Sequence, residues 1–489
     1  MTHARETCSE NQSTLSMGLL SLLTSRGRPD ENQTGHEDER SLGVVATTDV
    51  DVAKVLHRPA SSRKHCNTLT IPLCNPRAPQ AVEQLHAAVT RMPSGPRWNA
   101  QAAATKRAQL LSACQYIRNA LENNQTDAQA DALGALHGLP QALLDCRPPT
   151  IADAAKSAAK SSKASGSGSS VEAELPAPLS VEMRQSICDW DFDIFKVPYD
   201  DLARVAFHAM CANDEITSLG VDHVKLWRYV RTVAERYHKR PFHNLRHAVD
   251  VTLAVSILAR LVAKAHPEAF EDKTTLAALV VAAFAHDIDH PGCMNNFLVA
   301  TSHPLAVLYA NQSVLERHHC ATATALLQRP ENDFLAPLER SKRDAFLKSM
   351  QEDIIATDVT TSVAAIKEFQ QRRDSPTPSM MAHLIIKAAD ISNPSKIVGV
   401  YEQWTRGVIS EFFAQGDAER SLGLPISANC DRDSVVVCQT QVGFISDLVA
   451  PLFAALSQYT DRGLLGGGAD PTLQAICSRI EENKLYHQR

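Results

Sequence analysis

Apolar side chains recur every three to four residues through most of the chain beyond residue 177, a spacing that gathers them on one face of an α-helix. Strand-like alternation of apolar and polar residues is scarce, and Pro, Asp or Asn marks many segment ends. One apolar stretch, Leu276 to Ala285, is too short to cross a bilayer and shows no alternation, so we predict a buried helix there. The pattern predicts an all-α domain over residues 177–489.

The chain before this domain has a different composition. Residues 1–95 are polar and irregular, and we predict that they are mostly disordered. Residues 96–146 carry apolar positions at helical spacing, among them Leu110 and Ile117, and we predict a short helical segment of unknown role. Residues 147–176 are rich in Ala, Ser, Gly and Lys, a composition that buries no core and is typical of a flexible linker.

Basic and aromatic side chains are frequent in the helical segment 96–146, where Trp98, Lys106, Arg107 and Arg118 occur. Such a face is found in helices that bind calmodulin. A small packing helix with a solvated basic face explains the same residues more simply, and we prefer that interpretation. A homodimer or a regulatory partner that binds through the N-terminal region is a further alternative.

Charge and cysteine content narrow the function classes. The formal net charge of -6 provides no basic field for nucleic acid, so we expect no nucleic-acid partner. The 12 cysteines are scattered without a CxxC pair, which fits reduced thiols better than a disulfide framework. No stretch is expected to approach a membrane span, and we find no signal peptide or lipidation motif. We therefore expect a cytoplasmic protein.

Three separated segments carry His or Asp side chains, the first of them on a helix that we expect to start near Pro241. His243 and His247 are four residues apart, His286 and Asp287 follow the apolar stretch that ends at residue 285, and Asp390 ends a third apolar run. Each motif alone could be a helix cap or a buried histidine. Together, two His and two Asp from three helices predict a metal site made by His247, His286, Asp287 and Asp390. This mixed nitrogen and oxygen set suits zinc, and a carboxylate can bridge to a harder second metal such as magnesium.

The motifs occur in the order found in class I cyclic nucleotide phosphodiesterases, and residues 177–489 resemble the catalytic domain of that family. The matching motifs are His243-Asn-x-x-His247, His286-Asp-x-Asp-His290-Pro-Gly, Ser313-Val-Leu-Glu316-x-His-His319, Ala356-Thr-Asp358, Ala389-Asp390-Ile-Ser-Asn393-Pro394, Glu411-Phe-Phe-x-Gln-Gly-Asp417 and Gln441-Val-Gly-Phe444. The resemblance implies a compact multi-helix domain that hydrolyses the 3′-phosphoester of a 3′,5′-cyclic nucleotide to the 5′-monophosphate. The His286-Asp287 pair alone would indicate only the wider group of HD-type hydrolases.

The resemblance also implies roles for the site residues. It implies Zn²⁺ in a first site and Mg²⁺ (or Mn²⁺) in a second, with Asp287 as the bridge and a bridging hydroxide as the nucleophile. His243 is the implied general acid, which protonates the leaving 3′-oxygen. For Asp289 a structural role suits the pattern equally well. Three further side chains are implied around the metal-bound waters: His290, Glu316 and Thr357.

A second set of residues is implied to hold the nucleotide. The amide of Gln441 can pair with adenine or, after flipping, with guanine, while Phe444 and Val408 would contact the two faces of the base. Asn393 would lie beside the base, and Tyr401 would hold Gln441 in one orientation. These features favour cAMP, with cGMP open as a further substrate. The alternatives are another HD-type nucleotide phosphohydrolase and a non-catalytic scaffold that binds cyclic nucleotides.

Overall fold

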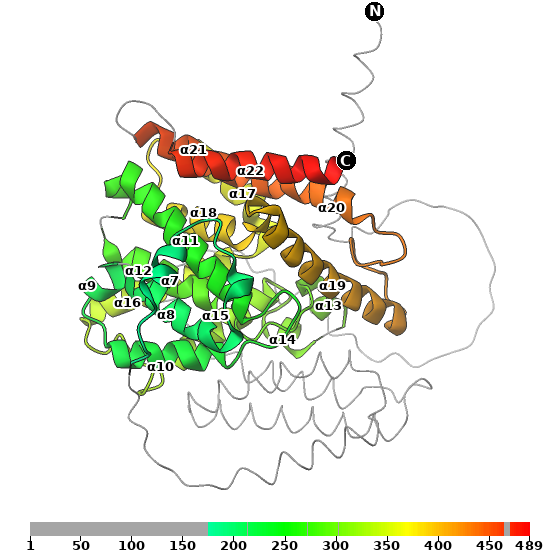
Figure 1. Ribbon diagram of the computed structural model, residues 1–489. Helices are drawn as coiled ribbons and strands as arrows, with labels where there is room; N and C mark the ends of the chain where they lie inside the picture. The colour runs from blue at the N-terminus through cyan, green and yellow to red at the C-terminus, as the bar shows by residue number, and fades with distance from the viewer. Residues whose placement is uncertain (1–174, 213, 271, 302, 464–469) are drawn as a thin grey trace, which may run out of the picture.

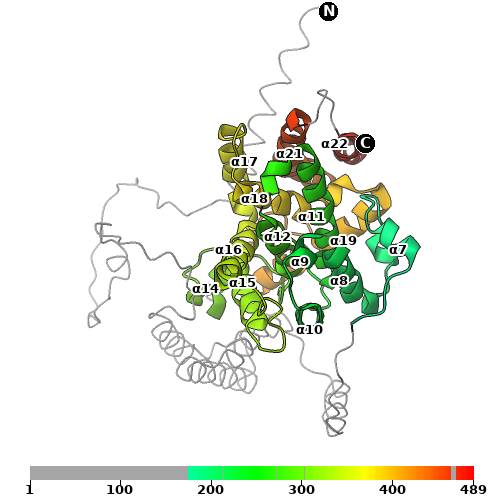
Figure 2. The same cartoon turned by 90° about the vertical axis from the view of Figure 1, so that its left-hand side faces the viewer.

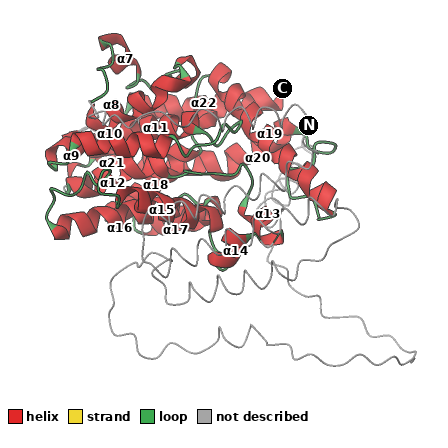
Figure 3. Ribbon diagram, turned by 90° about the horizontal axis from the view of Figure 1, so that it is seen from below, coloured by secondary structure: helices red, strands yellow, loops and turns green. Residues whose placement is uncertain are grey.

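The computed structural model describes residues 175–489 apart from 213, 271, 302 and 464–469 (Figure 1). Every regular element in this part of the chain is a helix, and no strand occurs within it (Figure 3). The prediction of an all-α fold is therefore confirmed. The predictions for residues 1–95, 96–146 and 147–174 lie outside the described residues.

The described helices follow one another with short connections. The α-helices are α7 (Val181–Ser186), α8 (Leu202–Ala212), α9 (Asp214–Ser218), α10 (His223–Ala234), α11 (Leu245–Ala265), α12 (Lys273–Ala285), α13 (Asn295–Ala300), α14 (Pro304–Leu308), α15 (Val314–Leu327), α16 (Arg340–Ala356), α17 (Ser362–Gln371), α18 (Pro378–Asp390), α19 (Val398–Leu422), α20 (Val437–Phe444), α21 (Ala450–Gly463) and α22 (Pro471–Gln488). The shorter turns are η2 (Ile194–Lys196), η3 (Tyr199–Asp201), η4 (Pro267–Phe270), η5 (Val359–Thr361), η6 (Asn393–Ser395) and the π-helical η7 (Ile445–Val449).

The helices α11, α12 and α18 form the centre of the domain (Figure 2). The predicted buried helix is confirmed, since every residue of α12 from Leu276 to Ala285 is buried. A helix that is apolar on all sides needs neighbours all round it. Here α11, α16 and α18 pack against α12, while α8 and α21 pack against α11. The His and Asp side chains predicted to bind metal therefore lie at the ends of the most buried helices of the domain.

Two of these central helices begin at side-chain caps. The Asn244 side chain accepts hydrogen bonds from the backbone N–H groups of Arg246 and His247, and so starts α11. The Thr377 side chain accepts from the N–H of Met380 at the start of α18. Because a cap fixes where a helix begins, it also fixes which residue of the next turns faces the core.

The long helix α19 approaches the segment before α11 closely. A Cβ atom at Gly407 would lie 2.7 Å from the carbonyl oxygen of Pro241, so only glycine permits this contact. The approach brings Glu411, one turn further along α19, against the backbone of Phe242 and His243. The helix ends at Gly423, whose φ of 69° is the left-handed conformation common at helix ends.

One continuous helix, Val437–Arg462, corrects the expectation that no stretch approaches a membrane span. It joins α20, η7 and α21, and it is long and apolar enough to cross a membrane, with a mean hydropathy of 1.3. Its side chains Val449, Leu452 and Phe453 are fully buried within the domain. A core helix passes the same test of length and composition, and 44% of the most apolar 18-residue window of this helix is buried within the domain.

The cysteines agree with the expected reduced state. The seven cysteines in the described part of the chain are all free. Cys293 and Cys430 are buried, and the others are half-buried or exposed. Cellular location is a separate matter, and the cytoplasmic assignment stays a prediction.

Candidate metal centre and nucleotide site

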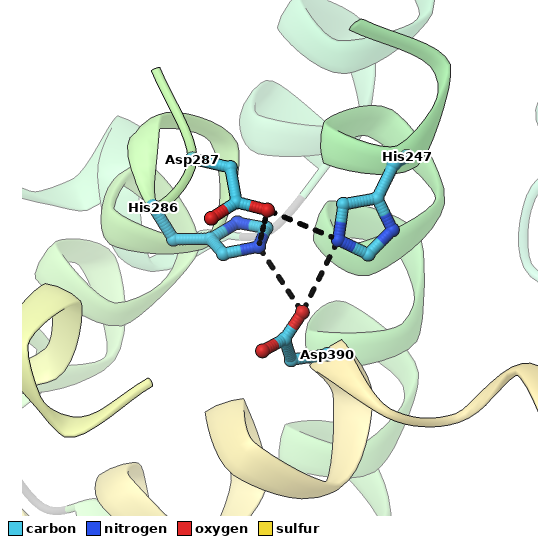
Figure 4. Close-up of side chains that lie close together, drawn as sticks. All are labelled: His247, His286, Asp287 and Asp390. Carbon is cyan, nitrogen blue, oxygen red and sulfur yellow. Dashed lines mark hydrogen bonds and ion pairs between the residues drawn. The ribbon is translucent and has the colours of Figure 1, made fainter. Parts of the chain in front are cut away.

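Four predicted ligands from three helices converge at one point (Figure 4). His247 comes from α11, His286 and Asp287 directly follow α12, and Asp390 is the last residue of α18. Asp390 Oδ1 lies 3.1 Å from His247 Nε2 and 3.2 Å from His286 Nε2. Asp287 Oδ2 lies 3.4 Å and 3.2 Å from the same two nitrogens. The structure thus brings together the side chains that the sequence grouped.

The spacing of the four donor atoms fits one divalent cation. Ligand atoms about 2.1 Å from a cation stand about 3.0 Å apart in octahedral and about 3.4 Å apart in tetrahedral geometry. The Nδ1–H of His286 donates to the Ala283 carbonyl at 2.8 Å, which leaves the Nε2 lone pair facing the cluster. The side chains of Asp287 and Asp390 are 13% and 20% exposed, so the cluster can be reached from solvent on its carboxylate side.

Opposite charges hold the cluster together without a cation. Burial alone would lower the pKa of His286, but the carboxylates of Asp287 and Asp390 raise that pKa well above its ordinary value. Burial would raise the pKa of Asp390, but His286 and a hydrogen bond with His247 lower it to about 2. A cation that binds here must therefore displace protons from the imidazoles.

The second oxygen of Asp287 faces another group of candidate ligands. Asp287 Oδ1 lies 3.7 Å from His319 Nε2, and His290 completes this group. The Nδ1–H of His319 donates to the Ile288 carbonyl at 2.6 Å, while its buried Nε2 has no hydrogen-bond partner within the described part of the chain. Burial lowers the pKa of His319 to about 3, so its Nε2 carries a free lone pair. This arrangement suits a second cation bridged by Asp287.

His319 lies in a motif that the sequence showed, but its position at the site was not anticipated. The other side chains expected around metal-bound water have partners of their own. Glu316 accepts a hydrogen bond from the Asn295 side chain at 2.9 Å, and burial raises its pKa to about 7. The Thr357 hydroxyl donates to the Ile354 carbonyl at 2.8 Å. The roles of His290, Glu316 and Thr357 stay predictions.

The geometry of Asp289 favours the structural alternative. Its backbone has a φ of 65°, which non-glycine residues seldom adopt. Its two carboxylate oxygens lie 2.9 Å from His238 Nε2 and 3.2 Å from His318 Nε2. These contacts connect the turn after Asp287 to two other parts of the domain and thereby help to hold the ligands His286 and Asp287 in position.

The predicted general acid, His243, is held by a carboxylate. Its Nδ1–H donates to Glu411 Oε2 at 2.5 Å, and its ring stacks on His290 with the ring centres 3.7 Å apart. Glu411 Oε1 accepts from the backbone N–H groups of Phe242 and His243 at 2.7 Å and 2.9 Å. Glu411 is only 4% exposed, whereas His243 is 22% exposed. His243 therefore keeps a fixed tautomer, with Nε2 left for a substrate.

The same contact sets the charge of His243. Burial lowers the pKa of this imidazole, but the Glu411 carboxylate and its hydrogen bond reverse the effect, and the net pKa is raised above its ordinary value. Burial would raise the pKa of Glu411, but the positive charge of His243 holds it below the usual range. Glu411 belongs to a motif seen in the sequence, yet it was not singled out as a site residue.

The predicted nucleotide-binding residues lie on α19, α20 and η6. The Tyr401 hydroxyl donates to Gln441 Oε1 at 2.8 Å, and both side chains are buried. Val408, Phe444 and Asn393 are half-buried. Phe444 immediately precedes the π-helical turn η7, a distortion that is frequent at functional sites, and Gln441 lies one turn earlier on α20. The contact between Tyr401 and Gln441 is the one that the resemblance implies, while the binding roles stay predictions.

Comparison with known proteins finds similarity to cyclic nucleotide phosphodiesterases. Residues 242–464 match the family model described as 3′5′-cyclic nucleotide phosphodiesterase. The probable 3′,5′-cyclic-AMP phosphodiesterase pde-4 of Caenorhabditis elegans is 31% identical over 330 residues, which cover 63% of this chain and 47% of that protein. The mouse dual specificity calcium/calmodulin-dependent 3′,5′-cyclic nucleotide phosphodiesterase 1C is 33% identical over 295 residues, 58% of this chain and 41% of that protein. Rat 3′,5′-cyclic-AMP phosphodiesterase 4C is 30% identical over 318 residues, 61% of this chain and 57% of that protein.

The chain spans about half the length of the curated relatives it matches. The matched segment contains the metal cluster, His243, Glu411, Tyr401 and Gln441. Residues 242–464 of this chain thus match the 3′,5′-cyclic nucleotide phosphodiesterase family, and the resemblance of this part of the chain to a class I phosphodiesterase catalytic domain, inferred from the motifs, is confirmed.

Proposed function

We propose that this protein hydrolyses the 3′-phosphoester bond of a 3′,5′-cyclic nucleotide to give the 5′-monophosphate, with cAMP as the favoured substrate. One observation carries the proposal: a histidine oriented by a buried carboxylate stands beside a cluster that fits a divalent cation. The rings of His243 and His247 are 6.0 Å apart, so a phosphate at the cluster lies within reach of the proton on His243. Such a reaction would end a second-messenger signal.

The metals are proposed from the chemistry of the donors. Two imidazole nitrogens and two carboxylates suit Zn²⁺ in the site of His247, His286, Asp287 and Asp390. The second position, beside Asp287 Oδ1, offers fewer protein donors, and this suits Mg²⁺ or Mn²⁺, which keep several waters. When bound, two such cations neutralise phosphate charge and make an attacking water acidic enough to react at neutral pH.

The residues of the chain supply proton transfer and orientation. His243 donates the proton from Nε2 to the leaving 3′-oxygen, because its Nδ1–H is engaged by Glu411. Glu411 favours the charged imidazole, accepts one hydrogen bond from its ring and accepts two more from the backbone N–H groups of Phe242 and His243. The negative charges of Asp287 and Asp390 further favour the protonated form of His243 before a cation arrives.

Preference for cAMP is proposed from the contact between Tyr401 and Gln441. The Tyr401 hydroxyl donates a hydrogen bond to the Gln441 amide oxygen, and this favours the amide orientation in which the oxygen faces Tyr401. Two of the relatives are named as cyclic-AMP enzymes and one as a dual specificity enzyme. We therefore propose cAMP first and cGMP as a further substrate. A homodimer or a regulatory partner at the N-terminal region stays a prediction, as does the cytoplasmic location.

The test is product analysis with the purified full-length protein and added Zn²⁺ and Mg²⁺. The panel comprises cAMP, cGMP, a nucleoside triphosphate and p-nitrophenyl phosphate. Formation of 5′-AMP from cAMP, with the last two compounds untouched, is the expected result. Cleavage of the triphosphate or the monoester instead would indicate a different HD-type phosphohydrolase. Binding of cAMP without any product would indicate a non-catalytic scaffold.

A further inference from the structure

The last helix, α22 (Pro471–Gln488), lies beyond the segment that matches the family model, which ends at residue 464. It nevertheless packs against η6 and α20, the two elements that carry Asn393 and Gln441 (Figure 1). The hydrogen bonds of Asn483 and the ring contact of His487, through which α22 meets the site, do not involve the metal ligands or His243. The helix therefore reaches the nucleotide-binding side of the site and leaves its metal side to other elements.

The buried side chain of Asn483 clamps the backbone of the η6 turn. Its Nδ2 group donates to the carbonyl oxygens of Pro394 and Lys396, both at 2.8 Å, and the residue is 3% exposed. Both amide hydrogens are thus used on the stretch that directly follows Asn393. A buried carbonyl without its donor is costly, so loss of Asn483 would favour a shift of the Pro394 and Lys396 carbonyls.

Other contacts hold the side chains of this turn and one of its carbonyl groups, since Trp190 Nε1–H also donates to the Ser395 carbonyl at 3.3 Å. Trp190 Nε1–H donates to Ser395 Oγ at 3.1 Å. The buried Lys396 ammonium donates to the Trp190 carbonyl at 2.9 Å and lies 3.6 Å from Asp250 Oδ1. The turn is therefore anchored from three sides, and α22 supplies the anchor nearest to Asn393 along the backbone.

The end of α22 touches the second part of the nucleotide site. The ring of His487 packs edge-on against the ring of Tyr401, with centres 5.4 Å apart and an angle of 88° between the planes. Tyr401 in turn donates to Gln441 Oε1 at 2.8 Å. A change at His487 is therefore transmitted to the residue that sets the orientation of the Gln441 amide.

We propose that α22 is a positioning element for nucleotide recognition, in which Asn483 places Asn393 and His487 places Tyr401 against Gln441. The inference rests on the proposed hydrolysis of cyclic nucleotides. In this proposal α22, which lies outside the matched region, affects substrate affinity and the choice between cAMP and cGMP. Because α22 makes no contact with the metal ligands in these interactions, zinc content and the chemical step are left unchanged.

The main test is Asn483→Asp in the full-length protein. The substitution keeps the shape of the side chain but sets a carboxylate against two carbonyl oxygens. We expect KM for cAMP to rise about tenfold, equivalent to about 1.4 kcal/mol of binding free energy. We expect kcat to stay within about twofold and zinc content to be unchanged, since the interaction acts on binding rather than on the transition state alone.

The matched control is Asn332→Asp. Asn332 is also a buried amide that donates to a backbone carbonyl, that of Leu326 at 3.0 Å, but it lies in the connection between α15 and α16. Both variants should lower the melting temperature, and only Asn483→Asp should raise KM. Equal loss of stability with an unchanged KM in both would overturn the proposal.

A second pair of variants keeps the test decisive if Asn483→Asp does not fold. His487→Ala removes the ring that supports Tyr401, whereas Tyr486→Phe removes only the exposed hydrogen bond with Glu402. We expect His487→Ala to change the ratio of kcat/KM for cAMP and cGMP at least about threefold, and Tyr486→Phe to leave the ratio unchanged. An unchanged ratio in His487→Ala contradicts the role of α22. Wild-type protein that hydrolyses neither nucleotide refutes the proposed function itself, which is a different outcome.

Discussion

Replacing Glu411 with Gln tests how the domain prepares its general acid. The carboxylate of Glu411 is 4% exposed and accepts the Nδ1–H of His243 at 2.5 Å. The amide of Gln is neutral, so the substitution removes a buried charge-assisted hydrogen bond while its oxygen can still accept the two backbone N–H groups. Hydrogen bonds to charged groups contribute about 1.5–3 kcal/mol. At 1.36 kcal/mol per factor of ten, this predicts a loss of about 10- to 150-fold in kcat.

The pH profile distinguishes this explanation from general damage to the site. The pKa of His243 is raised by the Glu411 carboxylate, which favours the protonated imidazole, so activity should fall as pH rises through that pKa. Without the Glu411 charge, the pKa of His243 falls, and the alkaline limb of the kcat profile should move to lower pH. The assay is kcat for cAMP across the neutral range, with zinc content measured on the same samples.

Glu419→Gln is the matched control for this experiment. Glu419 lies two turns further along α19, is 3% exposed and accepts the backbone N–H of Ser427 at 2.7 Å. It has no contact with His243 among the interactions in the described part of the chain, so its variant should lose stability without a shift of the pH profile. An unshifted profile in Glu411→Gln, or an equal shift in Glu419→Gln, would refute the reasoning.

Three further predictions concern the metal cluster and the packing of α19. Asp287→Ala should lower metal affinity by more than about 100-fold, since residues that merely support a ligand already contribute about 10–100-fold. Activity should be lost together with the metal, and full activity at normal metal content would contradict the bridging role. The carboxylates raise the pKa of His286 well above its ordinary value, so protons compete with the cation for this imidazole. Zinc affinity measured by competitive titration should therefore fall steadily from about pH 8 to pH 5. An affinity that does not change with pH would count against the cluster as the zinc site. Gly416→Ala should cost about 1–3 kcal/mol of unfolding free energy in denaturant titration, because its Cβ would lie 1.9 Å from the Cys430 carbonyl oxygen, whereas Gly399→Ala, with open space around it, should be neutral or stabilising.

The sequence was sufficient to predict the fold class and the ligands His247, His286 and Asp287 because these depend on local spacing. Apolar periodicity identified α12, and its end placed His286 and Asp287 at the edge of the core. The spacing of four residues predicted that His243 and His247 share a helix that begins near Pro241, but α11 begins at Leu245. His243 lies before this helix, and the turn there places its ring centre 6.0 Å from that of His247. Asp390 required the family motif, since nothing local links it to residues more than 100 positions earlier.

The residues that sequence reasoning missed act over long separations. Glu411 meets His243 across 168 residues, and the contact depends on Gly407 allowing α19 to approach Pro241. Asn483 meets Pro394 across 89 residues, and no motif marks it. Spacing along the chain carries no information about such pairs, because they are fixed by how helices pack. For the same reason Asp289 could be assigned a structural role only once its two histidine partners were seen.

The most direct test of the account measures cAMP turnover against metal content in one preparation of the full-length protein. The protein is stripped with a chelator, reloaded stepwise with Zn²⁺ in excess Mg²⁺, and assayed for 5′-AMP at each step, with His243→Asn taken through the same series. The account predicts that turnover rises in proportion to bound zinc in the wild type, while His243→Asn binds the same zinc but turns over about 10²- to 10⁴-fold more slowly. Full zinc loading with no turnover of cAMP or cGMP, or full turnover by the stripped protein, would contradict it.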